Sequence, residues 1–118
     1  MAVLRIVPNV ATGSVDGVRQ FYAALFDLAV VMDHGWIATL AGDAVARPQI
    51  GIASEGGSGA PVPAISIEVD DVDAVHARAL AIGAPIAYPL TDEPWGVRRF
   101  FVRDPAGMLV NVLAHRAA

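Results

Sequence analysis

The chain has 118 residues, of which 55% are hydrophobic, so it suits one domain with an ordinary apolar core and not a disordered segment. Its net charge is −4 and all eight basic residues are arginines, which argues against a nucleic-acid surface and against attraction to an anionic membrane. The absence of cysteine excludes disulfides, thiolate metal sites and a cysteine nucleophile. The opening MAVLRIVPNV lacks the pattern of a signal peptide, and no apolar run approaches the roughly 20 residues that span a bilayer, so a soluble cytoplasmic protein is expected.

The first half of the chain predicts one helix among four strands. Residues 3–12 are typical of a strand, and Ser14 is placed to cap a helix over residues 15–26. The side chains expected on the buried face of this helix are Val15, Val18, Tyr22 and Leu25. Further strands are predicted over residues 28–32, 36–41 and 48–54, the last two separated by GDAVAR.

The second half repeats this order after a linker. Residues 55–63, EGGSGAPVP, are dense in glycine, serine and proline and predict a segment without regular structure. A strand follows over residues 64–69, and Asp71 is placed to cap a helix that ends before Gly83. The side chains expected on its buried face are Val72, Val75, Ala79 and Ile82. A strand over residues 85–90, a loop over 91–96 and a final hairpin complete the chain.

The two halves match residue by residue in places. The helices match at an offset of 57 and the last hairpins at an offset of 61, for example Gly35 with Gly96 and Asp43 with Asp104. We therefore predict a single α+β domain made of two βαβββ modules, at about residues 3–54 and 64–115. The modules are expected to form a curved, sheet-lined cup with the helices on the outside.

Three stretches carry a family resemblance: VDGVRQFYAALFDLAVV, SIEVDDVDAVHARALAIGAPI and PWGVRRFFVRDPAGMLVNVL. They resemble the vicinal oxygen chelate superfamily, which includes glyoxalases, bleomycin-resistance proteins and extradiol dioxygenases. The RDPAG turn before the last strand is the most specific of these features. The resemblance implies the fold, but its members include several kinds of enzyme and binding protein, so it does not name the function.

In the metal-dependent members of this superfamily, the first and last strands of each module supply histidine, glutamate or glutamine ligands. Carried over by position, these ligands fall on Val7, Ala64, Asn111 and either Ile50 or Gly51. Aliphatic side chains do not bind a divalent cation, and an asparagine oxygen is a weak ligand. We therefore predict no metal and no other cofactor. Gln49 reaches a ligand position only with a slip of the strand, and the three histidines, His34, His76 and His115, have no ligand spacing.

A lone polar residue in the last strand, Asn111, becomes the centre of the expected site. It faces either a ligand cavity or a neighbour inside a filled core. Pairing across an Asp104–Gly107 turn predicts Arg98 and Phe100 on the same face, and alternation predicts Glu68 and Asn9 on inner faces. Glu68 and Arg98 are expected to form an ion pair, either at the end of the pocket or on a solvated rim. Trp95 packs against a ligand, a helix or a partner chain. The predicted ligand-binding residues are Asn111, Arg98, Phe100, Trp95, Glu68 and Asn9.

Three functions remain open from the sequence. The first is a metal-independent binding protein that sequesters an apolar or aromatic compound, as the bleomycin-resistance branch does. The second is a glyoxalase-like or dioxygenase-like enzyme with an atypical site. Without a metal it could use Glu68 as a general base, but no paired acid has a clear position. The third is a degenerate structural or regulatory member. Catalysis is the less favoured of these readings. The expected partners are an unidentified small molecule and a second copy of the chain, because open sheet edges need covering.

Overall fold

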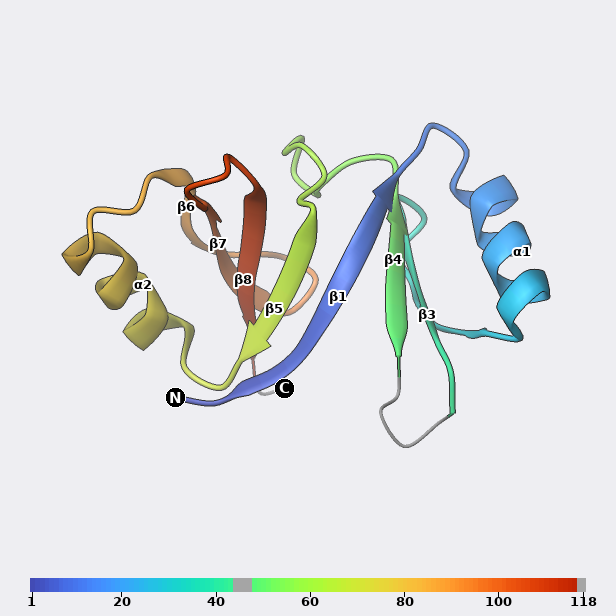
Figure 1. The fold of residues 1–118 in the computed structure, drawn as a ribbon, viewed down its shortest axis with the longest axis horizontal. Helices are drawn as coiled ribbons and strands as arrows, with labels where there is room; N and C mark the ends of the chain where they lie inside the picture. The colour runs from blue at the N-terminus through green and yellow to red at the C-terminus, as the bar shows by residue number, and fades with distance from the viewer. Residues whose placement is uncertain (44–47, 117–118) are drawn as a thin grey trace. The chain divides into compact units, whose positions relative to one another are not determined.

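The computed structural model describes residues 1–43 and 48–116, and its eight strands and two helices follow the predicted order (Figure 1). Residues 44–47 of the predicted GDAVAR connection lie outside the described residues. The chain divides into two compact units, and one boundary between them in the sequence falls within β1 (Val3–Ala11). We call Val7–Val62 the first unit, and Met1–Ile6 together with the residues from Pro63 onward the second unit.

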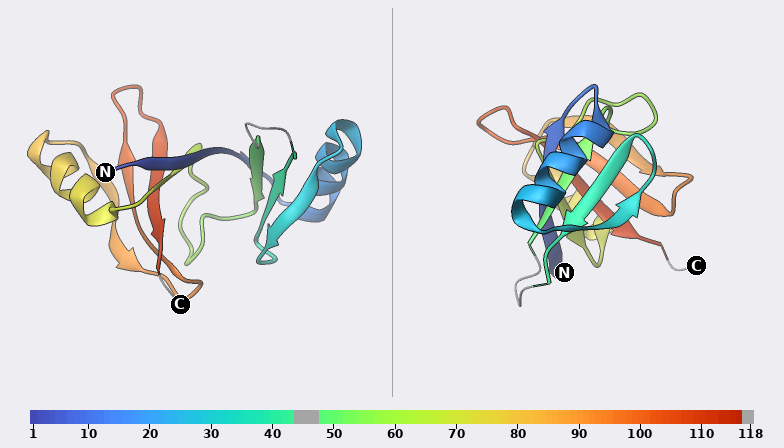
Figure 2. Two further views of the ribbon diagram at one scale, coloured as in Figure 1. Left: turned by 90° about the horizontal axis from the view of Figure 1, so that it is seen from below. Right: turned by 90° about the vertical axis from the view of Figure 1, so that its right-hand side faces the viewer.

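The first unit is a four-stranded sheet with one helix. The strand order is β2-β3-β4-β1, with β1 and β4 parallel and the other pairs antiparallel. These elements are α1 (Val15–Phe26), β2 (Ala29–Asp33), β3 (Ile37–Ala41) and β4 (Gln49–Ala53). Figure 2 shows α1 lying along the sheet of this unit. Val15, Val18 and Tyr22 of α1 pack on a core formed by Ala38, Leu40 and Ile52.

The second unit repeats this plan. The strand order is β5-β8-β7-β6, and the first residues of β1 lie beside β5. These elements are β5 (Ile65–Val69), α2 (Val72–Ala81), β6 (Ile86–Asp92), β7 (Val97–Arg103) and β8 (Leu109–His115). The helix α2 packs on one face of the sheet, over a core that includes Val69, Phe100, Val110 and Val112. The predicted fold class, α+β with two βαβββ modules, is therefore confirmed.

Two helix-face predictions are wrong. Leu25 is 60% exposed and Ile82 is 77% exposed, although both had been placed on buried faces. Each stands at the end of its helix, Leu25 in the last turn of α1 and Ile82 as the cap of α2, so neither continues the buried stripe. The cap predictions differ between the helices, because Asp71 accepts a hydrogen bond from the Ala74 N–H while the Ser14 side chain makes no cap bond.

The segment between the last strand of the first module and β5 has no helix or strand, as predicted. It is nevertheless an ordered turn. The Gly56 N–H donates to the Ala60 carbonyl over 2.7 Å, and the Ala60 N–H donates to the Gly57 carbonyl over 2.9 Å. Among the described residues, no helix is long and apolar enough to cross a membrane.

Candidate functional site

The second unit places four side chains in a row across its sheet. Ser66 of β5, Asn111 of β8, Phe101 of β7 and Tyr88 of β6 are successive cross-strand neighbours. The adjacent residues Phe100 and Val112 belong to the core beneath α2. Because neighbouring residues of a strand point to opposite faces, Asn111 and Phe101 lie on the face away from the helix. We call these four residues the second row.

Asn111 is the polar centre of this row. Its side chain is buried, with 8% exposure, and its Nδ2 donates a hydrogen bond to Ser66 Oγ over 3.1 Å. Its Oδ1 is also buried but has no hydrogen-bond partner among the described residues. Leaving a buried acceptor without a donor costs about 1–3 kcal/mol of folding stability. A hydrogen bond from a donor outside the chain to this oxygen would therefore be favourable.

The predicted neighbours of Asn111 are wrong by one residue. Asn111 lies opposite Phe101, and the whole β7–β8 ladder follows this register, from Val97 opposite His115 to Arg103 opposite Leu109. The prediction assumed a two-residue turn between Asp104 and Gly107. Instead, the Asp104 N–H donates to the Met108 carbonyl and Gly107 adopts a φ of +82°, which adds one bulged residue to the loop. A shift of one residue reverses every side chain of the strand.

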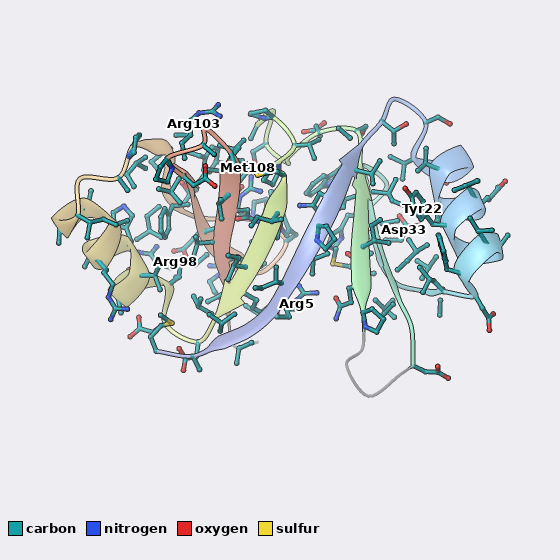
Figure 3. The ribbon with its side chains drawn as sticks, viewed as in Figure 1. Arg5, Tyr22, Asp33, Arg98, Arg103 and Met108 are labelled. Carbon is teal, nitrogen blue, oxygen red and sulfur yellow. The ribbon has the colours of Figure 1, made fainter. Side chains whose placement is uncertain are left out.

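Arg98 and Phe100 consequently lie on the α2 side of the sheet, where Figure 3 shows Arg98. Phe100 is fully buried and packs edge-on against His76 of α2, with ring centres 4.9 Å apart. Arg98 pairs with Asp73 of α2 over 2.9 Å and with Asp92 over 3.2 Å. These hydrogen bonds raise the pKa of Arg98, and the bond from Arg98 lowers the pKa of Asp73. Neither Arg98 nor Phe100 shares the face of Asn111.

The predicted ion pair between Glu68 and Arg98 is also wrong. Glu68 pairs instead with Arg5 of β1, whose Nε lies 2.5 Å from Oε1, and with His115, whose Nδ1 lies 2.9 Å from Oε2. Partial burial alone would raise the pKa of Glu68. The hydrogen bonds from His115 and Arg5 outweigh this effect and hold the pKa of Glu68 below its ordinary value.

The sequence does not single out the adjacent arginine, Arg99. Its side chain is 3% exposed and its Nη2 lies 2.6 Å from Oε2 of Glu93, which is equally buried. The Tyr88 hydroxyl donates to the same carboxylate over 3.0 Å. The guanidinium carbon stands 4.8–4.9 Å from the ring centres of Tyr88, Trp95 and Phe101. Trp95 therefore packs against a buried cation of its own unit.

The first unit carries an equivalent row. Asn9 of β1, Gly51 of β4, Thr39 of β3 and Met32 of β2 are successive cross-strand neighbours. Since α1 packs on Leu40 and Ile52, these four residues lie on the face away from that helix. We call them the first row. The matching registers make Gly51, rather than Ile50, the counterpart of Asn111.

The residues at the superfamily's ligand positions do not fit a metal ion. Val7, Ala64 and Gly51 have no donor atom, and Asn111 offers only a neutral amide. Across residues 1–43 and 48–116, no three histidine, aspartate or glutamate side chains gather as a metal site requires. The buried Oδ1 of Asn111 can accept a hydrogen bond from a donor. The side chains at the other three ligand positions have no atom that could coordinate a cation.

Similar proteins agree on the fold. A search of curated proteins finds no match. Among solved structures, a Legionella pneumophila chain described as an NAD-dependent benzaldehyde dehydrogenase has a TM-score of 0.77 at 14% identity, covering 95% of this chain and 100% of its own. A Streptomyces coelicolor methylmalonyl-CoA epimerase has a TM-score of 0.73 at 19% identity, covering 98% and 100%.

A superfamily member from Vibrio splendidus 12B01 has a TM-score of 0.64 at 16% identity, covering 97% of this chain and 99% of its own. The TM-scores show a shared fold, and the low identities leave the activity open. The family model for the glyoxalase/bleomycin resistance protein/dioxygenase superfamily matches residues 5–112. The chain therefore belongs to the glyoxalase/bleomycin resistance protein/dioxygenase superfamily.

Proposed function

We propose that this protein binds a small, flat and mainly apolar organic molecule without the help of a metal ion. The observation that carries the proposal is the buried Oδ1 of Asn111, which has no hydrogen-bond partner among the described residues. An acceptor in this state is best satisfied by a ligand that brings an O–H or N–H group. The proposed ligand is thus an aromatic compound with one such donor.

The surroundings of Asn111 support an apolar and uncharged ligand. Phe101 lies beside Asn111 on β7, and Leu109 and Leu113 share its face on β8. Arg99, a buried cation on the same face of the sheet, is already neutralised by Glu93. A site of apolar walls with one or two polar groups is the usual composition of a small-molecule pocket. The pair of Asn111 and Ser66 would orient the ligand.

Binding is favoured over catalysis by the state of the charged groups. Glu68 is the candidate general base, but its pKa is lowered and both carboxylate oxygens are engaged, by Arg5 and His115. A carboxylate held this way is a poor proton acceptor near neutral pH. Asn111 also cannot supply the charge that a metal-binding carboxylate brings to the same position.

The test compares two probes of nearly equal shape, 1-naphthol and 1-fluoronaphthalene, by isothermal titration calorimetry in the presence of EDTA. Only the naphthol can donate a hydrogen bond. We expect it to bind roughly tenfold more tightly, which corresponds to about 1.4 kcal/mol. In Asn111→Leu the preference should vanish. Gln20→Leu, which removes an exposed amide from α1, is the matched control and should keep the preference.

Equal affinity of both probes for the native protein and for Asn111→Leu would overturn the proposal, and so would binding that EDTA abolishes. The homodimer expected from the sequence remains a prediction. Light scattering at micromolar concentration tests it, and a monomer mass would contradict it.

A further inference from the structure

The two rows place the chain's asparagines at related positions. The sequence contains two asparagines, Asn9 and Asn111, and each lies in the parallel strand pair of its own unit. In the second row, Asn111 on the last strand faces the small residue Ser66 on the first. In the first row the order is reversed, since Asn9 is on the first strand and Gly51 on the last. Each pair thus holds one carboxamide beside one small residue.

Gly51 is essential to this arrangement. A Cβ placed on Gly51 would stand 2.0 Å from Oδ1 of Asn9 and 3.2 Å from its Cγ. Real Cβ atoms are not found at such a distance, so any other residue at position 51 would displace the Asn9 side chain. The carboxamide of Asn9 therefore occupies the space that Gly51 leaves empty on β4. Gly51 does not have a positive φ, so its lack of a side chain is explained by this contact and not by its backbone conformation.

We propose that Gly51 is a positioning residue, whose missing side chain seats Asn9 as the ligand-binding amide of the first row. This inference rests on the proposed function, because it concerns recognition of the same class of aromatic ligand with a polar group. Asn9 is half-buried, so part of its side chain remains accessible. A carboxamide has both donors and an acceptor, so Asn9 can hydrogen-bond a hydroxyl in either direction.

The presence of only two asparagines makes a selective experiment possible. Protein labelled with ¹⁵N-asparagine gives two side-chain amide signals in NMR spectra, which Asn9→Ala and Asn111→Leu assign. Titration with 1-naphthol should shift both signals. In Gly51→Ala, the Asn9 signal should move before any probe is added and should no longer respond to the probe. Gly13→Ala is the control, because a Cβ there meets no atom within 4 Å, and it should behave as the native protein.

Affinity provides a second readout. Asn9→Ala and Gly51→Ala should each weaken 1-naphthol binding about threefold to tenfold, as expected for one lost hydrogen bond. The double variant Asn9→Ala/Gly51→Ala, in which the clash is removed, should bind no more weakly than either single variant. This double variant keeps the test decisive if Gly51→Ala folds poorly.

The outcomes separate the two proposals. If the Asn111 signal responds to the probe while the Asn9 signal does not, the inference about Gly51 fails and the proposed function stands. If the Asn9 signal responds equally in Gly51→Ala and in the native protein, the positioning role is wrong. If neither asparagine responds, the proposed function fails, and this inference fails with it.

Discussion

Replacing Glu93 by glutamine should destabilise the fold strongly, because it breaks a buried ion pair of the second unit. The carboxylate of Glu93 and the guanidinium of Arg99 are both 3% exposed and lie 2.6 Å apart. Glutamine has nearly the same shape, but it leaves the Arg99 charge buried without its counter-charge. Breaking a buried ion pair in this way costs about 3–5 kcal/mol.

The magnitude is large for a chain of this length. Domains are stable by about 5–15 kcal/mol in total. A loss of 3 kcal/mol would lower the melting temperature by roughly 12 °C at about 4 °C per kcal/mol. We expect a loss of stability near 3 kcal/mol, because in Glu93→Gln the Arg99 guanidinium still makes cation–π contacts with the rings of Tyr88, Trp95 and Phe101.

The assay is urea unfolding followed by far-UV circular dichroism, which avoids the altered surroundings of Trp95. Glu93→Gln, Arg99→Met and the double variant form a cycle, and the double variant should be much more stable than the sum of the two losses predicts, by about 2 kcal/mol or more. Arg98→Met is the matched control, since its partners Asp73 and Asp92 are exposed. It should cost under about 1 kcal/mol. Additive losses in the cycle, or equal losses for Arg98→Met and Arg99→Met, would refute the reasoning.

Three further predictions concern stability. The pKa of Glu68 is lowered in the fold, so its stabilising effect should be complete above its unfolded pKa near 4.5 and should disappear as the pH falls through the folded pKa. The urea midpoints of the native protein and of Glu68→Gln should therefore converge at low pH. A difference between the midpoints that stays constant with pH would contradict this prediction. Asp71→Ala should cost about 1 kcal/mol in urea unfolding because it removes a cap bond, whereas Ser14→Ala should cost nearly nothing, and equal losses would argue against the cap. Gly107→Ala should cost about 1 kcal/mol because φ is +82°, with Gly13→Ala as the neutral comparison; a Gly107→Ala protein as stable as the native one would exclude the bulged turn.

The elements and their order could be predicted because their signals are local. Alternation, caps and the glycines at positions 83 and 96 mark the helices and strands, and the repeat of the pattern indicates two modules. The position of Asn111 on the last strand was also correct, because the RDPAG turn fixes where that strand begins.

The surroundings of Asn111 could not be predicted, because they depend on one residue in a turn. Arg98 and Arg99 are adjacent and chemically identical, so the sequence alone does not tell which one is buried. The bulge at Gly107 decides it, by placing Arg99 and Phe101 on the face of Asn111. The ion pair of Glu68 with Arg5 joins residues that are 63 positions apart, and no local sequence pattern predicts it.

The division of β1 between the two units has a consequence for the order in which the protein can fold. The Ala2 N–H donates to Asp70 Oδ1 over 2.8 Å, and the Asp70 N–H donates to the Ala2 carbonyl over 3.1 Å, closing a contact across 68 positions of sequence. The residues at the start of β1 are therefore synthesised well before β5, and they have no place in their sheet until β5 has been made. Contacts of such long range are slow to form. Until then the outer edge of β5 lacks its neighbour and can pair with another chain, so a fragment beginning at Pro63 should aggregate more readily than the whole protein.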